Sequence, residues 1–123
     1  MTLVDAARIL IAEDEAISAM WLEMELTNRG HTVLGVVASG AGAVQVAARE
    51  EPDVVLMDIR LAGPMDGIQA ARTILAARRC AVIFMSGYSD QLVRVQSETG
   101  HAAGYLSKPI RVSDLERLLA AVT

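Results

Sequence analysis

The most constraining feature of this sequence is a set of short apolar runs that alternate with stretches of helical periodicity. The runs are Ile9–Ala12, Thr32–Ala38, Val54–Met57, Ala81–Met85 and Ala102–Leu106. Apolar runs of this length are typical of strands buried on both faces, as found in parallel sheets covered by helices. Because parallel strands need crossover connections, the repeated pattern predicts a doubly wound α/β domain with five strands and five helices.

The first interval predicts an amphipathic helix. Its apolar residues recur at i, i+3, i+4 and i+7, and they are Ile17, Met20, Trp21 and Met24. We expect this face to be the apolar side of the helix, and Gly30 to end the helix, because glycine readily takes the left-handed conformation that follows a helical C-terminus.

The later intervals also predict helices. The second helix is expected after Ser39 and the third near Asp66. Their expected apolar faces are Val44, Ala47 and Ala48, and Ile68, Ala71 and Leu75. A fourth, more polar helix is expected from about Ser89. The last helix is expected to open with a capping box formed by Ser113 and Glu116.

Length, composition and charge limit the class of protein. The chain has 123 residues, which fits one domain, placed here at residues 1–123. Hydrophobic residues make up 53% and aromatic residues 3% of the chain, so the core must be mainly aliphatic. The formal charge of -4 leaves no basic field for a phosphate backbone, so direct nucleic-acid binding is not expected.

Nothing in the sequence predicts export or membrane insertion. The apolar runs are far shorter than the ~18 residues of a membrane span, and the N-terminal segment carries Asp5. The single Cys80 has no partner for an internal disulfide, which fits a reducing compartment. We therefore expect a cytoplasmic protein.

Polar residues stand at the carboxyl ends of four of the apolar runs. Glu13 and Asp14 follow the first run, Asp58 the third, Ser86 the fourth and Lys108 the fifth. In a doubly wound sheet these ends meet at the edge where ligands bind. Clustered carboxylates repel one another unless a cation joins them, and oxygen ligands suit Mg2+. The two histidines and the single cysteine lack the spacing of a zinc site.

Each of these residues also has an ordinary structural explanation. Glu13 and Asp14 would complement the dipole of a helix start, Asp58 and Ser86 would end strands, and Lys108 would be a solvated surface residue. Their joint placement favours chemistry instead. A carboxylate such as Asp58 can attack a phosphoryl donor to give an acyl phosphate. Ser86 can then donate to a phosphoryl oxygen, and Lys108 can pair with Asp58 before the reaction.

Five sequence fragments at these positions form a recognisable set. They are Glu13-Asp14, Leu56-Met57-Asp58, Met65-Asp66-Gly67, Ser86-Gly87 and Gly104-Tyr105-Leu106-Ser107-Lys108-Pro109. Together they resemble the receiver domain of two-component response regulators over nearly the whole chain. The resemblance implies a flavodoxin-like parallel sheet of strand order 2-1-3-4-5. It also implies phosphoryl transfer from a histidine kinase or a phosphotransfer protein.

The resemblance assigns the metal site. It makes Asp58 the phosphoryl acceptor and a direct Mg2+ ligand together with Asp14. Glu13 would act through water, and the backbone carbonyl of Arg60 would complete the protein ligands. Pro109 would fix the loop that presents the lysine, with a cis peptide bond before it as one option.

The resemblance also assigns the switch residues. Ser86 matches the hydroxyl residue that moves toward the phosphoryl group, Lys108 the lysine that contacts it, and Tyr105 the aromatic residue that changes rotamer. The alternative for Tyr105 is an ordinary strand residue with its hydroxyl in water. Two features depart from the common pattern: the loop 60–67 is one residue longer than usual, and serine replaces the stiffer threonine at position 86.

The output implied by the resemblance is regulatory. The chain would be a phosphoacceptor switch and not an enzyme, apart from any promotion of its own phosphorylation and dephosphorylation. Since the chain stops at Thr123, we expect a stand-alone receiver that controls a partner protein through the surface of the fourth helix, fifth strand and fifth helix. A phosphate shuttle or sink in a phosphorelay is the alternative, and a homodimer is compatible with either.

Three functions of other classes fit the sequence less well. A haloacid-dehalogenase-type aspartyl-phosphate hydrolase would need an Asp-x-Asp nucleophile after the first strand, where this chain has Glu13-Asp14-Glu15. A flavin carrier would need a phosphate-binding loop rich in hydroxyl residues and glycine at that place. A pure protein-interaction module would not need Asp58, Lys108 and both acids.

Overall fold

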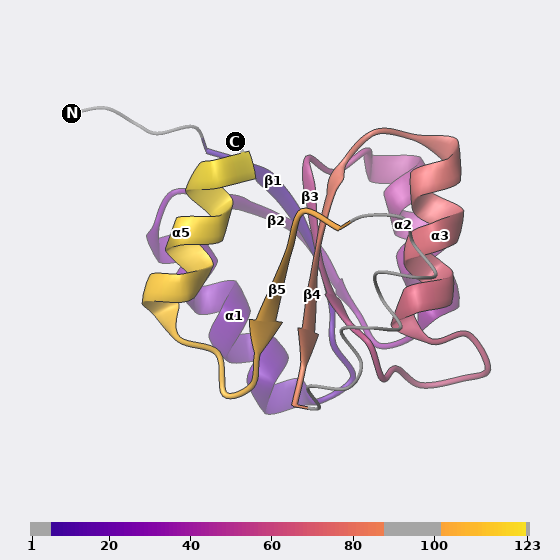
Figure 1. The fold of residues 1–123 in the computed structure, drawn as a ribbon, viewed down its shortest axis with the longest axis horizontal. Coiled ribbons are helices and arrows are strands. Elements are labelled where there is room, and N and C mark those ends of the chain that lie inside the picture. Colours follow the sequence, from indigo (N-terminus) through magenta and orange to yellow (C-terminus); the bar gives the residue numbers. More distant parts are fainter. Residues whose placement is uncertain (1–5, 88–101, 123) are drawn as a thin grey trace.

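The computed structural model describes residues 6–87 and 102–122. It contains a five-stranded parallel sheet in the order β2-β1-β3-β4-β5 (Figure 1). The strands are β1 Arg8–Ala12, β2 Thr32–Val37, β3 Val54–Asp58, β4 Ala81–Ser86 and β5 Gly104–Ser107. The described helices are α1 Ala16–Asn28, α2 Gly40–Glu50, α3 Gly67–Ala77 and α5 Val112–Val122. The predicted fold class and strand order are confirmed, while the helix expected from about Ser89 lies outside the described residues.

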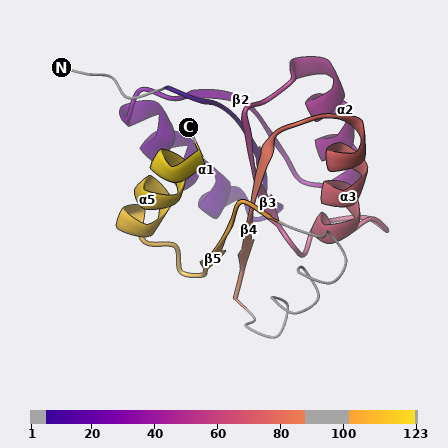
Figure 2. The same ribbon diagram turned by 45° about the horizontal axis from the view of Figure 1, so that its top comes forward.

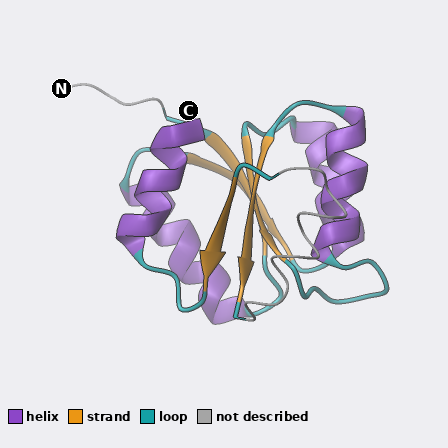
Figure 3. Ribbon diagram, in the orientation of Figure 1, coloured by secondary structure: helices purple, strands orange, loops and turns teal. Residues whose placement is uncertain are grey.

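Helices cover both faces of the sheet. Figures 2 and 3 show α1 and α5 on one face and α2 and α3 on the other. Along β1, Ile9 and Ile11 join the core beneath α1 and α5, whereas Leu10 and Ala12 join the core beneath α2 and α3. Strands β3 and β4 alternate in the same way, as expected when successive side chains point to opposite faces. Residues two positions apart therefore share one of the two cores.

Two side-chain caps fix the starts of the helices that follow β2 and β3. The hydroxyl oxygen of Ser39 accepts a hydrogen bond from the backbone N–H of Gly42 at 3.0 Å. Asp66 and Gln69 form a reciprocal capping box at the start of α3, with hydrogen bonds of 2.9 and 3.0 Å. Both helix starts agree with the sequence prediction. Gly30, at φ 89°, follows α1 as predicted.

Of the four residues on the predicted apolar face of the first helix, only Trp21 packs against the core beneath α1 and α5. Ile17, Met20 and Met24 are 81%, 61% and 59% exposed, and Trp21 is half-buried. The fully buried residues of this helix are Ala19, Leu22 and Leu26. Both sets recur at helical spacing, so the helix is apolar on more than one side and periodicity alone does not identify the buried side.

Two further local predictions were wrong. Helix α5 begins at Val112, so Ser113 lies inside the helix and is not its capping residue. On α2, Ala48 is exposed and the buried positions include Ala43 and Ala47. Within residues 6–87 and 102–122, no helix is long and apolar enough to cross a membrane.

Candidate functional site

Side chains along each strand alternate between the two faces of the sheet, and this alternation decides which polar residues meet at its carboxyl edge. Glu13, Asp58 and Lys108 each follow, two positions later, a core residue beneath α1 and α5. These core residues are Ile11, Leu56 and Leu106. The backbone continues the ladder, because Glu13 N–H donates to the Val37 carbonyl at 2.9 Å and Lys108 N–H to the Ser86 carbonyl at 2.9 Å. The three side chains are therefore directed to the same face.

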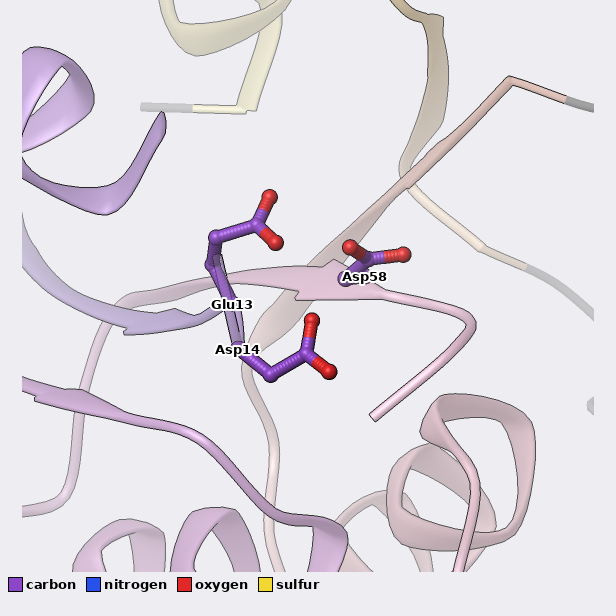
Figure 4. A group of neighbouring side chains, drawn as sticks. All are labelled: Glu13, Asp14 and Asp58. Carbon is purple, nitrogen blue, oxygen red and sulfur yellow. The ribbon is translucent and has the colours of Figure 1, made fainter. Parts of the chain in front are cut away.

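Three carboxylates form a cluster at this edge. Oxygen atoms of Glu13, Asp14 and Asp58 all lie within 4.8 Å of one another. Figure 4 shows the carboxylates of Glu13 and Asp14, from the segment after β1, turned toward the end of β3 and Asp58. Glu13 and Asp58 are only 2% and 5% exposed, whereas Asp14 is exposed. The cluster is thus open to solvent on the Asp14 side.

The ammonium group of Lys108 joins two of these carboxylates. Its Nζ donates to Asp58 Oδ2 at 2.6 Å and to Glu13 Oε1 at 2.9 Å. The other oxygen of each carboxylate is bonded too: Asp58 Oδ1 accepts from the Arg60 N–H at 3.1 Å, and Glu13 Oε2 from the Glu15 N–H at 3.1 Å. Buried charges need such partners, and each of the four oxygens of these two carboxylates has one.

Burial and neighbouring charges shift the pKa values of Glu13 and Lys108. Burial raises the pKa of Glu13, with the neighbouring Asp58 acting in the same direction and Lys108 opposing it. Burial acts to lower the pKa of Lys108, but its hydrogen bonds to Asp58 and Glu13 outweigh burial and leave the pKa above its ordinary value. Lys108 therefore stays charged at neutral pH.

The donor set fits a hard divalent cation. All three side-chain donors are carboxylate oxygens, and Asp14 presents its carboxylate to solvent next to the buried Asp58. A cation of the Mg2+ type takes oxygen ligands, keeps several waters, and commonly uses one or two carboxylates. Both oxygens of Glu13 already accept a hydrogen bond, one from Lys108 and one from the Glu15 N–H.

Comparison with known proteins identifies the family. The sequence model described as the response regulator receiver domain matches residues 9–122. The chain belongs to this family. The transcriptional regulatory protein PdtaR of Mycobacterium tuberculosis is 36% identical to this chain over 108 residues, which are 88% of this chain and 52% of PdtaR.

Two other similar proteins agree with this assignment. The phyllosphere-induced regulator PhyR of Methylorubrum extorquens is 31% identical over 94% of this chain and 43% of PhyR. A solved structure of the signal receiver domain of a modulated diguanylate cyclase from Desulfovibrio desulfuricans has a TM-score of 0.84 and 32% identity, covering 94% of this chain and 91% of the other. The present chain matches about half the length of PdtaR and of PhyR.

The structure brings together six of the seven residues predicted for the site of this receiver domain. A single pocket is lined by Glu13, Asp14, Asp58, Arg60, Ser86 and Lys108. Ser86 ends β4 and is 4% exposed. Tyr105 is outside the lining of this pocket; it is half-buried on β5 and packs against the core beneath α2 and α3.

A groove beside the site was not predicted from the sequence. It runs between α1 and the segment after β5, and it is lined by Glu13, Glu15, Ile17, Ser18, Trp21, Leu22, Lys108, Pro109 and Ile110. Glu13 and Lys108 line both this groove and the acidic pocket, so the two are continuous. The Lys108–Pro109 peptide bond is cis. The signal in the sequence was the number of apolar residues on the first helix, which exceeds what one buried face can hold.

Proposed function

We propose that this receiver domain accepts a phosphoryl group on Asp58 from a histidine kinase or a histidine phosphotransfer protein, in a reaction that depends on Mg2+. The observation that carries the proposal is the setting of the Asp58 carboxylate. It is 5% exposed, lies within 4.8 Å of two further carboxylates, and is held by the Arg60 N–H and the Lys108 ammonium. This setting favours a fixed nucleophile over an ordinary strand end.

The transfer would form one bond at Asp58 and break one bond in the donor. An oxygen of the Asp58 carboxylate attacks the phosphorus of the donor, an O–P bond forms, and the P–N bond to the donor histidine breaks. Asp14, Asp58 and the Arg60 carbonyl would hold Mg2+, with Glu13 contributing through water. When bound, the ion neutralises charge on the transferred phosphoryl oxygens. Lys108, which donates a hydrogen bond to Asp58, would pair with a phosphoryl oxygen in the product.

Phosphorylation would then act as the switch. The modification adds about -1.5 to -2 charge near neutral pH, which creates contacts for Ser86 and Lys108 and favours one of two conformations. Ser86 ends β4 and its neighbour β5 carries Tyr105, paired with Phe84. We propose that the change reaches a partner protein through the fifth strand and fifth helix, together with the segment between β4 and β5. In this role the domain is a signalling switch and not an enzyme with turnover of its own.

The phosphodonor is proposed to dock over the groove beside α1. Ile17, Met20 and Met24 form an exposed apolar stripe on this helix, and Ile17 also lines the groove. A donor helix that covers this stripe would bury apolar surface and bring its histidine toward the continuous acidic pocket. A small donor such as acetyl phosphate would not need this contact.

Intact-protein mass spectrometry tests the central claim. The protein is incubated with acetyl phosphate, with and without Mg2+, and compared with Asp58→Asn. We expect a single phosphate adduct on the wild-type chain that requires Mg2+ and is absent from the variant. An adduct that persists in Asp58→Asn, or no adduct with Mg2+ present, would contradict the assignment of Asp58.

A further inference from the structure

The loop that follows Asp58 begins and ends against the same strand end. The N–H of Gly67, the first residue of α3, donates to the Ile59 carbonyl at 2.8 Å. A Cβ on Gly67 would lie 2.0 Å from the Asp58 carbonyl oxygen, so only glycine permits this contact. The start of α3 therefore rests directly on the backbone of Asp58, and residues 59–66 form a closed loop beside the acidic pocket.

The outer part of this loop rests on the corner between β2 and α2. The Ala62 N–H donates to the Ala38 carbonyl at 3.0 Å, and Ala62 pairs with Ser39 as an isolated parallel bridge. Gly40, the buried first residue of α2, receives the end of the loop: a Cβ there would lie 2.6 Å from the Met65 carbonyl oxygen and 2.9 Å from Met65 Cγ. Any side chain at position 40 would force the loop and α2 apart.

The loop would move more easily than the helix. Helix α2 is fixed by Ala43 and Ala47, which are 0% and 1% exposed in the core, and by the Ser39 cap. Residues 60 and 62–64 of the loop are exposed. Arg60 lies between the two anchor points, and its N–H donates to Asp58 Oδ1. A displacement of the loop at Met65 and Ala62 would therefore move the backbone of Arg60 relative to the acceptor carboxylate.

We propose that Gly40 is a positioning residue for the reaction at Asp58: by letting the loop close against α2, it fixes the Arg60 backbone beside the acceptor carboxylate and the metal ligands. This inference rests on the function proposed for Asp58 and Mg2+. It makes the β2–α2 corner, which contributes no side chain to the pocket lining, a part of the reactive geometry.

The test compares Gly40→Ala with Gly35→Ala. Gly35 lies on β2, where a Cβ would meet only Val46 Cγ1 at 4.0 Å, so this variant controls for adding a methyl group to the same region. Mg2+ affinity is followed by the fluorescence of Trp21, the single tryptophan, which lines the groove together with Glu13 and Lys108. The rate of phosphorylation by acetyl phosphate is measured at a series of Mg2+ concentrations, and thermal unfolding is recorded for each variant.

We expect Gly40→Ala to weaken Mg2+ binding and slow phosphorylation by about tenfold, within the ~100-fold that a 1 Å misplacement can cost. Gly35→Ala should match the wild-type chain in Mg2+ affinity and in phosphorylation rate. A merely structural role would lower the unfolding temperature but leave the Mg2+ dissociation constant of the folded protein unchanged. That result, or equal Mg2+ dissociation constants for Gly40→Ala and Gly35→Ala, would overturn the positioning role.

A second pair of variants keeps the test decisive if Gly40→Ala does not fold. Ala62→Pro removes the N–H that donates to Ala38, while Ala62→Ser keeps it at an exposed position. The proline variant should show the same loss of Mg2+ affinity and the serine variant should not; equal behaviour of the pair would overturn the inference. If the wild-type chain gains no Mg2+-dependent adduct, the proposed function itself fails. If the wild-type chain is phosphorylated normally and the variants behave like it, only the positioning role of Gly40 fails.

Discussion

Replacing Lys108 by methionine should tighten Mg2+ binding even though it removes a residue of the site. The lysine bonds to Asp58 Oδ2 at 2.6 Å and Glu13 Oε1 at 2.9 Å, so its positive charge lies among the carboxylates that would hold the ion. Its side chain is 28% exposed, which means that solvent partly screens the charge. Methionine keeps much of the length of the side chain and removes only the ammonium group.

The size of the effect follows from Coulomb's law. A divalent ion among these carboxylates would lie roughly 5 Å from the ammonium, and with an effective dielectric constant of about 40 to 80 their repulsion amounts to about 2 to 3 kcal/mol. Loss of this repulsion corresponds to roughly 30- to 150-fold tighter binding. Proton uptake by Glu13 opposes the gain, because burial raises its pKa and the lysine would no longer counter that rise. The gain should therefore grow with pH.

Titration of Trp21 fluorescence with Mg2+ at pH 7 and pH 9 measures this effect. Arg72→Met serves as the control, because it removes one positive charge from an exposed position on α3, outside the pocket lining. We expect the control to bind Mg2+ like the wild-type chain. Unchanged or weaker binding by Lys108→Met at pH 9 would refute the idea that the lysine competes with the ion for these carboxylates.

Two further predictions concern pH and donor docking. His31 Nδ1 accepts a hydrogen bond from the Ala7 N–H at 3.0 Å, and burial, aided by Arg29, lowers its pKa. The unfolded chain therefore takes up the proton first, so stability should decline as the pH falls below about 6.5, as followed by urea unfolding, and His31→Asn should flatten that decline. The double variant Met20→Ser and Met24→Ser should slow phosphotransfer from a histidine kinase about fivefold or more, since a buried interface anchor contributes over about 1 kcal/mol. Its reaction with acetyl phosphate should match that of the wild-type chain; an equal loss with both donors would argue against docking on α1.

The sheet and the acidic site were predictable because they depend on short-range patterns. Each buried strand is a continuous apolar run, and the polar residue that ends it marks the carboxyl edge of the sheet. Glu13, Asp14, Asp58, Ser86 and Lys108 were located in this way, and all of them line the pocket. What the sequence could not provide was the division of Lys108 between two carboxylates, because this pairing depends on side-chain geometry across residues far apart in the chain.

The helix surfaces were less predictable for a physical reason. On α1, Ile17, Met20 and Met24 have the spacing of a core face but point to solvent, because Leu22 and Leu26 have that spacing as well and pack on the sheet. A pattern shows that a face is apolar, but not what covers it. The predicted capping box at the start of the last helix was wrong for a related reason. Serine is a common capping residue, but α5 has already begun at Val112, so Ser113 lies inside the helix.

The alternation of the strands carries a consequence for signalling. Glu13, Asp58 and Lys108 continue the face beneath α1 and α5, while Ser86 continues the face of Phe84, beneath α2 and α3. The two cores are separated by the sheet over most of its length, and the carboxyl edge is where polar groups from both faces line one pocket. The phosphoryl group proposed for Asp58 would therefore meet polar side chains that continue both faces of the sheet, Lys108 from one face and Ser86 from the other.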